Sequence, residues 1–198
     1  EISDGNGGTD TAVVTIAVPQ SAFSPVANAD TNTTDEDTTL TVNAANGLLN
    51  NDTDGNLDPI TVVSFTVNGT THPFGTIVNL TEGSLQINMD GSYEFVPASN
   101  FNGSVPEVTY TITDSTGTPN TSSTLNITVN PVNDPLVTTL DTNTTDEDTT
   151  LTVNAASGLL SNDTDVDGDV LSVTQFEVGG TTYPAGTTVS LTEGTLTI

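Results

Sequence analysis

Apolar and polar residues alternate with a period of two along most of the chain, as in β-strands that bury one face. The alternating segments are rich in Val, Ile, Thr and aromatic residues, and Gly, Asn, Asp or Pro separates them at short intervals. The clearest set predicts strands at residues 38–43, 58–67, 76–80, 83–88, 92–96, 107–113 and 122–129. No segment shows a helical period.

About seven strands in roughly a hundred residues are typical of an immunoglobulin-like β-sandwich, so we expect an all-β fold of this kind. Asn68-Gly69 is the strongest short hairpin signal in the chain. Residues 44–51 predict a compact turn that buries Leu48 and Leu49.

The sequence repeats itself over a long interval. Residues 142–156 are identical to residues 31–45, which gives a period of 142 − 31 = 111 residues and indicates tandem domains. We expect residues 1–19, with a strand at 11–18, to be the C-terminal strand of a preceding repeat, and residues 20–29 to be a linker. Residues 30–130 form a complete repeat, residues 131–140 a second linker, and residues 141–198 the truncated N-terminal part of a following repeat.

The charge of the chain is one-sided: 26 Asp and Glu, no Lys or Arg, and a formal net charge of -26. Side-chain salt bridges with Lys or Arg are therefore impossible, and carboxylates closer than about 8 Å repel one another even at physiological ionic strength. Folding should depend on bound cations, on high salt, or on both. Nucleic acid and membrane insertion are not expected, because the chain has neither basic side chains nor a long apolar run.

One acidic loop has the composition of a cation site. Asp163, Asp165, Asp167 and Asp169 alternate with other residues around Gly168, so a curled loop could direct all four carboxylates at one centre. Hard oxygen ligands in a flexible loop suit Ca²⁺ better than Zn²⁺ or Mg²⁺. A solvated acidic turn is the plainer alternative.

The corresponding loop of the first repeat is incomplete. Asp52, Asp54 and Asp58 are present, but Asn56 replaces the third carboxylate and Leu57 replaces the glycine. We expect this copy to bind a cation more weakly, or not at all.

Further acidic residues occur close to the linkers. Asp35-Glu36-Asp37 recurs as Asp146-Glu147-Asp148, and Asn133-Asp134 lies in the linker before the second triplet. A cation held by Asp35, Asp37, Asp146, Asp148, Asn133 or Asp134 could lock neighbouring repeats together. Alternatively, each triplet simply begins a strand in solvent.

These motifs together resemble the cadherin-like tandem repeats of giant bacterial surface adhesins of the repeats-in-toxin, type I secreted kind. The resemblance rests on the loop at 158–169, on Asp90-Gly91-Ser92-Tyr93, on residues 98–103 and 3–10, and on Val132-Asn133-Asp134-Pro135. It implies an extracellular, Ca²⁺-dependent β-sandwich that acts in cell adhesion or biofilm matrix as a rigid spacer, with neighbouring repeats of the same chain as partners.

An enzyme is not expected. The single histidine, His72, corresponds to Tyr183 one period later, which indicates packing or surface exposure rather than catalysis. An alternative function is a cell-surface filament in which residues 11–18 of one chain complete the sandwich of another. A carbohydrate-binding module ranks last, because it would need an exposed aromatic platform.

Overall fold

The computed structural model describes residues 1–16 and 22–198, which form β-strands, loops and three short 3₁₀ turns. The chain divides into two units, Glu1–Pro131 and Val132–Ile198, and each is described by itself. The end of the expected strand at 11–18 and the start of the expected linker at 20–29 lie outside the described residues.

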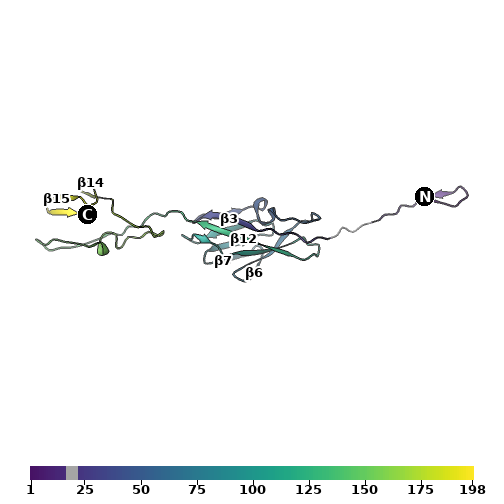
Figure 1. The fold of residues 1–198 in the computed structure, drawn as a ribbon, viewed down its shortest axis with the longest axis horizontal. Coiled ribbons are helices and arrows are strands. Elements are labelled where there is room, and N and C mark those ends of the chain that lie inside the picture. Colours follow the sequence, from purple (N-terminus) through teal and green to yellow (C-terminus); the bar gives the residue numbers. More distant parts are fainter. Residues whose placement is uncertain (17–21) are drawn as a thin grey trace. The chain divides into compact units, whose positions relative to one another are not determined.

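The first unit contains a β-sandwich (Figure 1). Its larger sheet has six strands in the order β10-β12-β11-β5-β6, and β3 pairs in parallel with β12. Apart from the β3–β12 pair, neighbouring strands of this sheet are antiparallel. The bounds are β3 Asp30–Asp35, β5 Thr61–Val67, β6 Thr70–Pro73, β10 Gly103–Ser104, β11 Val108–Thr113 and β12 Thr121–Asn130.

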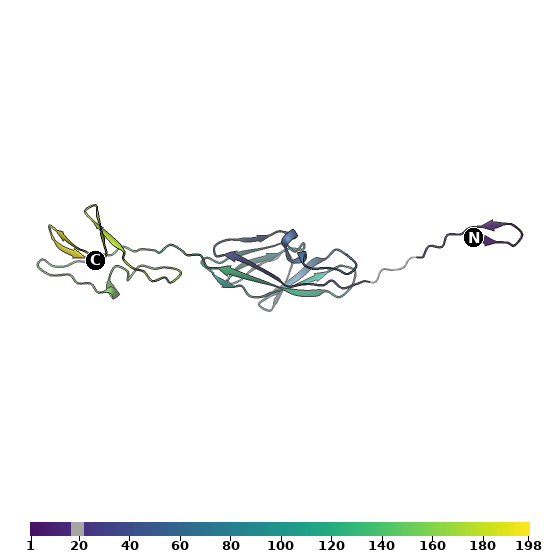
Figure 2. The same cartoon turned by 45° about the horizontal axis from the view of Figure 1, so that its top comes forward.

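The second sheet has four antiparallel strands in the order β4-β9-β8-β7. These are β4 Leu40–Val42, β7 Ile77–Asn79, β8 Gly83–Ile87 and β9 Tyr93–Pro97. Figure 2 shows the two sheets of this domain from a second direction. The all-β sandwich that the alternation predicts is confirmed.

The core lies between the two sheets, because every second residue of each strand points inward. Phe65, Phe95, Tyr110, Leu85 and Leu125 are among its fully buried side chains. Burying a large apolar side chain contributes about 1.5–3 kcal/mol. Since the chain has no Lys or Arg, side-chain ion pairs with these residues add nothing to the stability that this burial supplies.

The turn predicted at 44–51 consists of two 3₁₀ turns, Ala44–Asn46 and Leu48–Asn50. Leu48 is completely buried and Leu49 is half-buried against the core. The Leu48 amide donates to the Gly91 carbonyl at 2.9 Å. A Cβ atom on Gly47 would lie 2.3 Å from the same oxygen, so only glycine fits at this close approach.

All seven predicted strands of the first repeat are present, with ends shifted by a few residues. Three further strands, β3, β6 and β10, were not predicted. Strand β3 is Asp30–Asp35, a purely polar segment without hydrophobic alternation. It becomes a strand because β12 offers a free edge along six paired residues, so tertiary pairing overrides local propensity.

The strand expected at 11–18 is not observed over its described part. Residues 11–16 have no regular structure, and the preceding residues form a small hairpin of β1 (Ile2–Ser3) and β2 (Thr9–Asp10). A strand requires a hydrogen-bonded neighbour, and within the described residues none pairs with 11–16. The hairpin resembles the turn between β11 and β12: Asp4 and Asp114 each accept the amide two residues further on.

The second unit contains two hairpins and one 3₁₀ turn, Ala155–Ser157. Strand β13 (Gln175–Val178) pairs with β14 (Thr181–Pro184), and β15 (Thr188–Leu191) pairs with β16 (Gly194–Thr197). Residues 141–198 correspond to 30–87 of the first repeat. Counterparts of β9, β11 and β12 are not among them, so Leu159 is 40% exposed where Leu48 is fully buried.

Candidate metal centre and acidic loops

The acidic loop of the second unit is organised by Asp165. Its Oδ1 accepts the backbone amides of Asp167 at 3.0 Å and of Asp169 at 3.2 Å, which curls the chain around one carboxylate. Gly168 closes the turn at φ +78°. Asp163 Oδ1 instead accepts the Thr139 amide at 2.7 Å and so ties the loop to the linker. Asp169 is exposed.

Asp134 joins this loop. Its backbone amide donates to Asp167 Oδ2 at 2.7 Å, and carboxylate oxygens of Asp134 and Asp167 lie within 4.8 Å of each other. Two oxygens bound to one Ca²⁺, each about 2.3–2.6 Å from the ion, lie at most about 5 Å apart. Two carboxylates this close repel each other unless a proton or a cation lies between them. The donor set therefore fits Ca²⁺.

The corresponding loop of the first repeat has the same backbone hydrogen bonds but different side chains. Asp54 Oδ1 accepts the amides of Asn56 at 3.0 Å and of Asp58 at 3.2 Å, as Asp165 does. Asn56 Nδ2 donates to Asp58 Oδ2 at 2.5 Å, so an amide satisfies an oxygen that a cation could otherwise bind. Asp54 is only 7% exposed, and its Oδ2 is buried without a hydrogen-bond partner among the described residues.

Two apolar residues complete the difference. Phe23 occupies the position of Asp134, and its ring lies against Gly55. Leu57 stands in place of Gly168 and adopts the same left-handed conformation, at φ +64°. Leu57 is 89% exposed, so no packing offsets this backbone strain.

Leu57→Gly is therefore expected to stabilise the first repeat by about 0.5–1 kcal/mol. A non-glycine residue in the left-handed region costs about 1–2 kcal/mol, from which the greater chain entropy of unfolded glycine must be subtracted. Urea unfolding of the chain measures the change. Leu57→Ala is the matched control: it keeps the Cβ and should give no gain. An equal gain from both variants would contradict the strain argument.

The structure places the first acidic triplet at the opposite end of β3 from the linker it follows. Glu36 donates its amide to the Asn130 carbonyl at 2.9 Å, and Asp35 Oδ1 accepts Asn130 Nδ2 at 3.1 Å. Asp37, in a left-handed turn at φ 55°, accepts the Asn100 amide at 3.1 Å. The triplet therefore lies where the chain leaves the repeat.

Glu36 is the residue of this triplet that sequence reasoning missed. It is 4% exposed, and its Oε2 accepts Asn102 Nδ2 at 3.3 Å, whereas Asp35 and Asp37 are exposed. Glu36 follows directly after β3 and lies two positions from the buried Thr34, so both fall on the same side of the chain. Because this segment is entirely polar, no hydrophobic alternation signalled that side as the buried one.

The second triplet is an exposed turn. Asp148 has φ 59°, and the Thr149 amide donates to the Asp146 carbonyl at 3.3 Å. Asn133 is also exposed, and its Nδ2 donates to the Asp134 carbonyl at 2.9 Å. The linker runs alongside the loop at 165–169, and the Asp134 amide donates to that loop. A cation shared by Asp134 and this triplet stays a prediction.

A buried polar cluster surrounds Tyr110. Its hydroxyl donates to the Asn28 carbonyl at 2.6 Å or to Asp30 Oδ2 at 2.8 Å, and Asp52 Oδ2 lies 3.3 Å away. The Asn28 amide donates to Asp52 Oδ1 at 2.7 Å. Burial raises the pKa of Asp30, and burial together with the nearby Asp30 charge raises the pKa of Asp52. Burial, hydrogen bonding to Asp30 and both negative charges raise the pKa of Tyr110.

The acids of the first repeat are confined to loops and strand ends, with Glu94 in β9 as the exception. The outward positions of the larger sheet carry neutral side chains: Ser64, Thr66, Thr109, Thr111, Ser122, Thr124 and Asn126. The acidic loop at 52–58 lies beside the segment that enters the repeat, because Thr53 forms a β-bridge with Val26. The acidic triplet at 35–37 lies beside Asn130, where the chain leaves the repeat. Negative charge is therefore concentrated where one repeat meets the next segment of chain.

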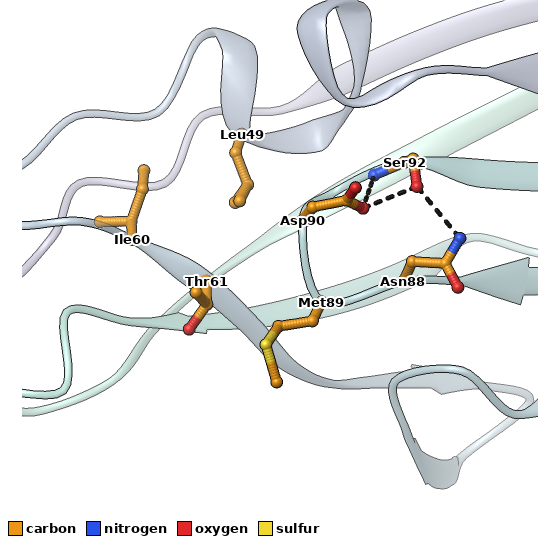
Figure 3. A pocket seen from close by; sticks show the side chains of 7 residues that line it. All are labelled: Leu49, Ile60, Thr61, Asn88, Met89, Asp90 and Ser92. Carbon is orange, nitrogen blue, oxygen red and sulfur yellow. Dashed lines mark hydrogen bonds between the residues drawn. The ribbon is translucent and has the colours of Figure 1, made fainter.

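The surface depression in Figure 3 offers little chemistry. It has a volume of about 510 Å³ and is lined mainly by Leu49, Ile60, Met89 and the turn around Asp90. Asp90 Oδ1 accepts hydrogen bonds from both the hydroxyl and the amide of Ser92, and these bonds lower the pKa of Asp90.

His72 lies outside this depression, and its ring centroid is 5.6 Å from that of Phe65. The corresponding rings one period later, those of Tyr183 and Phe176, are 5.7 Å apart. His72 is half-buried and packs against Phe65, which is one of the two roles expected from the sequence.

Fold and site together define a class: tandem β-sandwich structural repeats with acidic loops at the linkers. The family model of the bacterial cadherin-like domain matches residues 23–131, and that of the cadherin-like domain matches residues 132–198. The chain belongs to the bacterial cadherin-like domain family. A comparison with curated proteins finds no match.

The family assignment confirms that the chain is a non-enzymatic structural protein. Cadherin-like domains generally bind calcium, are typically extracellular and serve as structural repeats of the adhesion type. Among the described residues, no helix has the length and apolar character needed to cross a membrane.

Proposed function

We propose that this chain is an extender segment of a bacterial surface adhesin or biofilm-matrix protein, stiffened by calcium and acting as a spacer. The observation that carries the proposal is the loop of Asp165, Asp167 and Asp169 with Asp134 beside it, in a chain that has no Lys or Arg. Ca²⁺ removes the repulsion between these carboxylates and fixes the linker residue Asp134 against the following domain.

The distribution of charge supports a spacer. The neutral outward face of the larger sheet gives neighbouring molecules little to bind electrostatically, whereas the acids beside Val26 and Asn130 lie at both ends of the first repeat. Extracellular calcium modules bind at about 10⁻⁴–10⁻³ M, so the sites load outside a cell and empty inside it. A chain that is flexible during export would then become stiff at the cell surface.

Thermal unfolding of the chain with and without millimolar Ca²⁺ tests this function. Calcium at ten times its Kd should add about 1.4 kcal/mol per site and raise the melting temperature. Asp165→Ala with Asp167→Ala should abolish the part of the rise that the second unit contributes. Glu177→Ala with Glu193→Ala, which removes the same charge from exposed positions outside the loop, is the matched control and should keep the rise. An unchanged melting temperature in the unmodified chain would refute calcium stiffening.

A filament assembled by strand exchange is the second candidate. Val13, Val14 and Ile16 are highly exposed, and Val14 and Ile16 correspond to Leu125 and Ile127 of β12 with a spacing of 111 residues. Such a segment could pair with a sheet edge of another copy. Sedimentation of the purified chain separates the candidates, since a spacer remains monomeric whereas a filament subunit forms concentration-dependent polymers.

A further inference from the structure

We propose that the parallel pair of strands β3 and β12 is a mechanical clamp, through which the first repeat withstands tension along the chain. The inference adds resistance to force to the spacer role proposed above, and it does not involve calcium. Its basis is the geometry of the two strands through which the chain enters and leaves the repeat.

Strands β3 and β12 lie side by side and run in the same direction (Figure 1). Their ladder extends over six residue pairs, from Asp30 with Leu125 to Asp35 with Asn130, which is a length of about 20 Å. The chain therefore enters β3 at one end of the ladder and leaves β12 at the other end. Tension on the two ends of the repeat pulls the strands past each other, so it loads the ladder hydrogen bonds together rather than one after another.

Further hydrogen bonds extend the clamp at the end where the chain leaves. The Glu36 amide donates to the Asn130 carbonyl at 2.9 Å, directly beyond the last residue of β3. Asn130 Nδ2 also donates to Asp35 Oδ1 at 3.1 Å. The outgoing residue of β12 is therefore held by both the backbone and a side chain.

The segment that enters the repeat is fastened as well. Val26 and Thr53 exchange two backbone hydrogen bonds, at 2.7 and 3.1 Å. The hydroxyl of Thr121, the first residue of β12, donates to the Pro25 carbonyl at 2.6 Å. Contact between the incoming chain and β12 thus begins before β3 does, and a pull on the incoming chain must break it too.

The two strands are anchored differently in the domain. Strand β12 buries Leu125, Ile127 and Val129 in the core, whereas β3 is entirely polar. On the core side, β3 is held by a hydrogen bond from Asn32 Nδ2 to the Tyr93 hydroxyl at 2.9 Å. We therefore expect β12 to stay in place under tension, so that the resisting bonds are those between β12 and β3.

The polar sequence of β3 is itself repeated. The six residues Asp30–Asp35 recur without change at 141–146. A tandem array built in this way would carry one such clamp in each repeat, so that every repeat could take the same tension.

Pulling single molecules in two geometries tests the clamp. The chain has no cysteine, so two introduced cysteines define where the force acts. Ser24→Cys with Val132→Cys pulls the two strands past each other, whereas Thr39→Cys with Val132→Cys pulls the ladder apart from one end. All three positions are exposed. In calcium-free buffer at one pulling speed, the first geometry should need at least twice the force of the second, because forced unfolding follows the height of the barrier.

Three variants in the first geometry locate the resistance. The Glu36 amide faces β12, and the amides of a parallel ladder alternate, so the Asn32 amide faces β12 and the Thr33 amide faces away from it. Asn32→Pro interrupts the ladder and should lower the force by about half. Thr33→Pro should leave the force unchanged, because proline is tolerated on an edge strand where its nitrogen faces solvent. Asn32→Ala loses the bond to Tyr93 but keeps the amide, and should retain more force than Asn32→Pro.

The outcomes distinguish this inference from the proposed function. Equal forces in the two geometries, or a force that Asn32→Pro leaves unchanged, would overturn the clamp. Equal urea midpoints of the two double-cysteine variants verify that only the direction of pulling differs between them. Because these measurements contain no calcium, they leave calcium stiffening untouched, and a melting temperature that ignores calcium would in turn leave the clamp intact.

Discussion

Replacing Tyr110 by Phe is expected to lower the free energy of unfolding of the first repeat by about 2–3 kcal/mol. The hydroxyl is the donor that the Asn28 carbonyl at 2.6 Å and the Asp30 carboxylate at 2.8 Å share. Its removal leaves these acceptors without that donor, next to the half-buried Asp30 and the buried Asp52. A buried acceptor that loses its partner costs about 1–3 kcal/mol, and more when it is charged.

Tyr93→Phe is the matched control for this experiment. Tyr93 is also buried, but its hydroxyl accepts a single neutral hydrogen bond from Asn32 Nδ2 at 2.9 Å. Its loss should cost about 1 kcal/mol. Urea unfolding of the chain measures both changes. Equal losses in the free energy of unfolding would show that the carboxylates of Asp30 and Asp52 do not increase the contribution of the Tyr110 hydroxyl to stability.

The stability of the chain in calcium-free buffer is expected to peak close to pH 4 and to fall as the pH rises toward 7. Burial raises the pKa of Asp30 and Asp52 above the ordinary value of 3.8, so the folded state binds their protons more tightly than the unfolded state. The resulting stability is complete below 3.8 and is lost as the pH rises through the folded pKa values. Repulsion among the remaining acids acts in the same direction.

Stability should also fall below pH 4, through different residues. Hydrogen bonds from Ser92 lower the pKa of Asp90, and hydrogen bonds from Thr116 and Thr118 lower that of Asp114. Their contribution is present above 3.8 and is lost as the pH falls through their folded pKa values. Asp90 is exposed, so its share of this decline should be small, whereas Asp114 is only 4% exposed and should account for the larger share.

Two variants separate these pH ranges. Asp30→Asn should flatten the decline above pH 4, and Asp90→Asn should alter only the decline below it. Urea midpoints measured from pH 3 to 7 give the profile. A maximum between pH 6 and 7 that neither variant shifts would contradict the assignment of the buried acids.

Much of this architecture follows from the sequence. The alternation in segments such as residues 61–67 and 108–113 predicted strands, because only one face of each strand can be buried. The period of 111 residues predicted tandem repeats, and the acidic loop at 163–169 was recognised from its spacing. The prediction failed for β3 and for residues 11–16, where the presence or absence of a pairing partner decides.

The candidate site was predictable only in part. Spacing indicated Asp165, Asp167 and Asp169, but not that Asp54 would be buried or that Asp52 would turn toward Tyr110. It also did not indicate that Glu36 is the buried member of its triplet. The contacts of Asp52 with Tyr110 and of Glu36 with Asn102 join residues 58 and 66 positions apart, and local pattern carries no information about such neighbours.

By itself, the sequence determined the fold class and the repeat, because these follow from periodicity, and a charge of -26 with no Lys or Arg predicted a dependence on cations or on high salt. Only the tertiary structure decided which acids share a centre. The parallel pairing of β3 with β12 carries the first triplet to Asn130, and the linker running beside the loop brings Asp134 to Asp167. Both depend on hydrogen bonds between residues 95 and 33 positions apart, which local sequence pattern does not reveal.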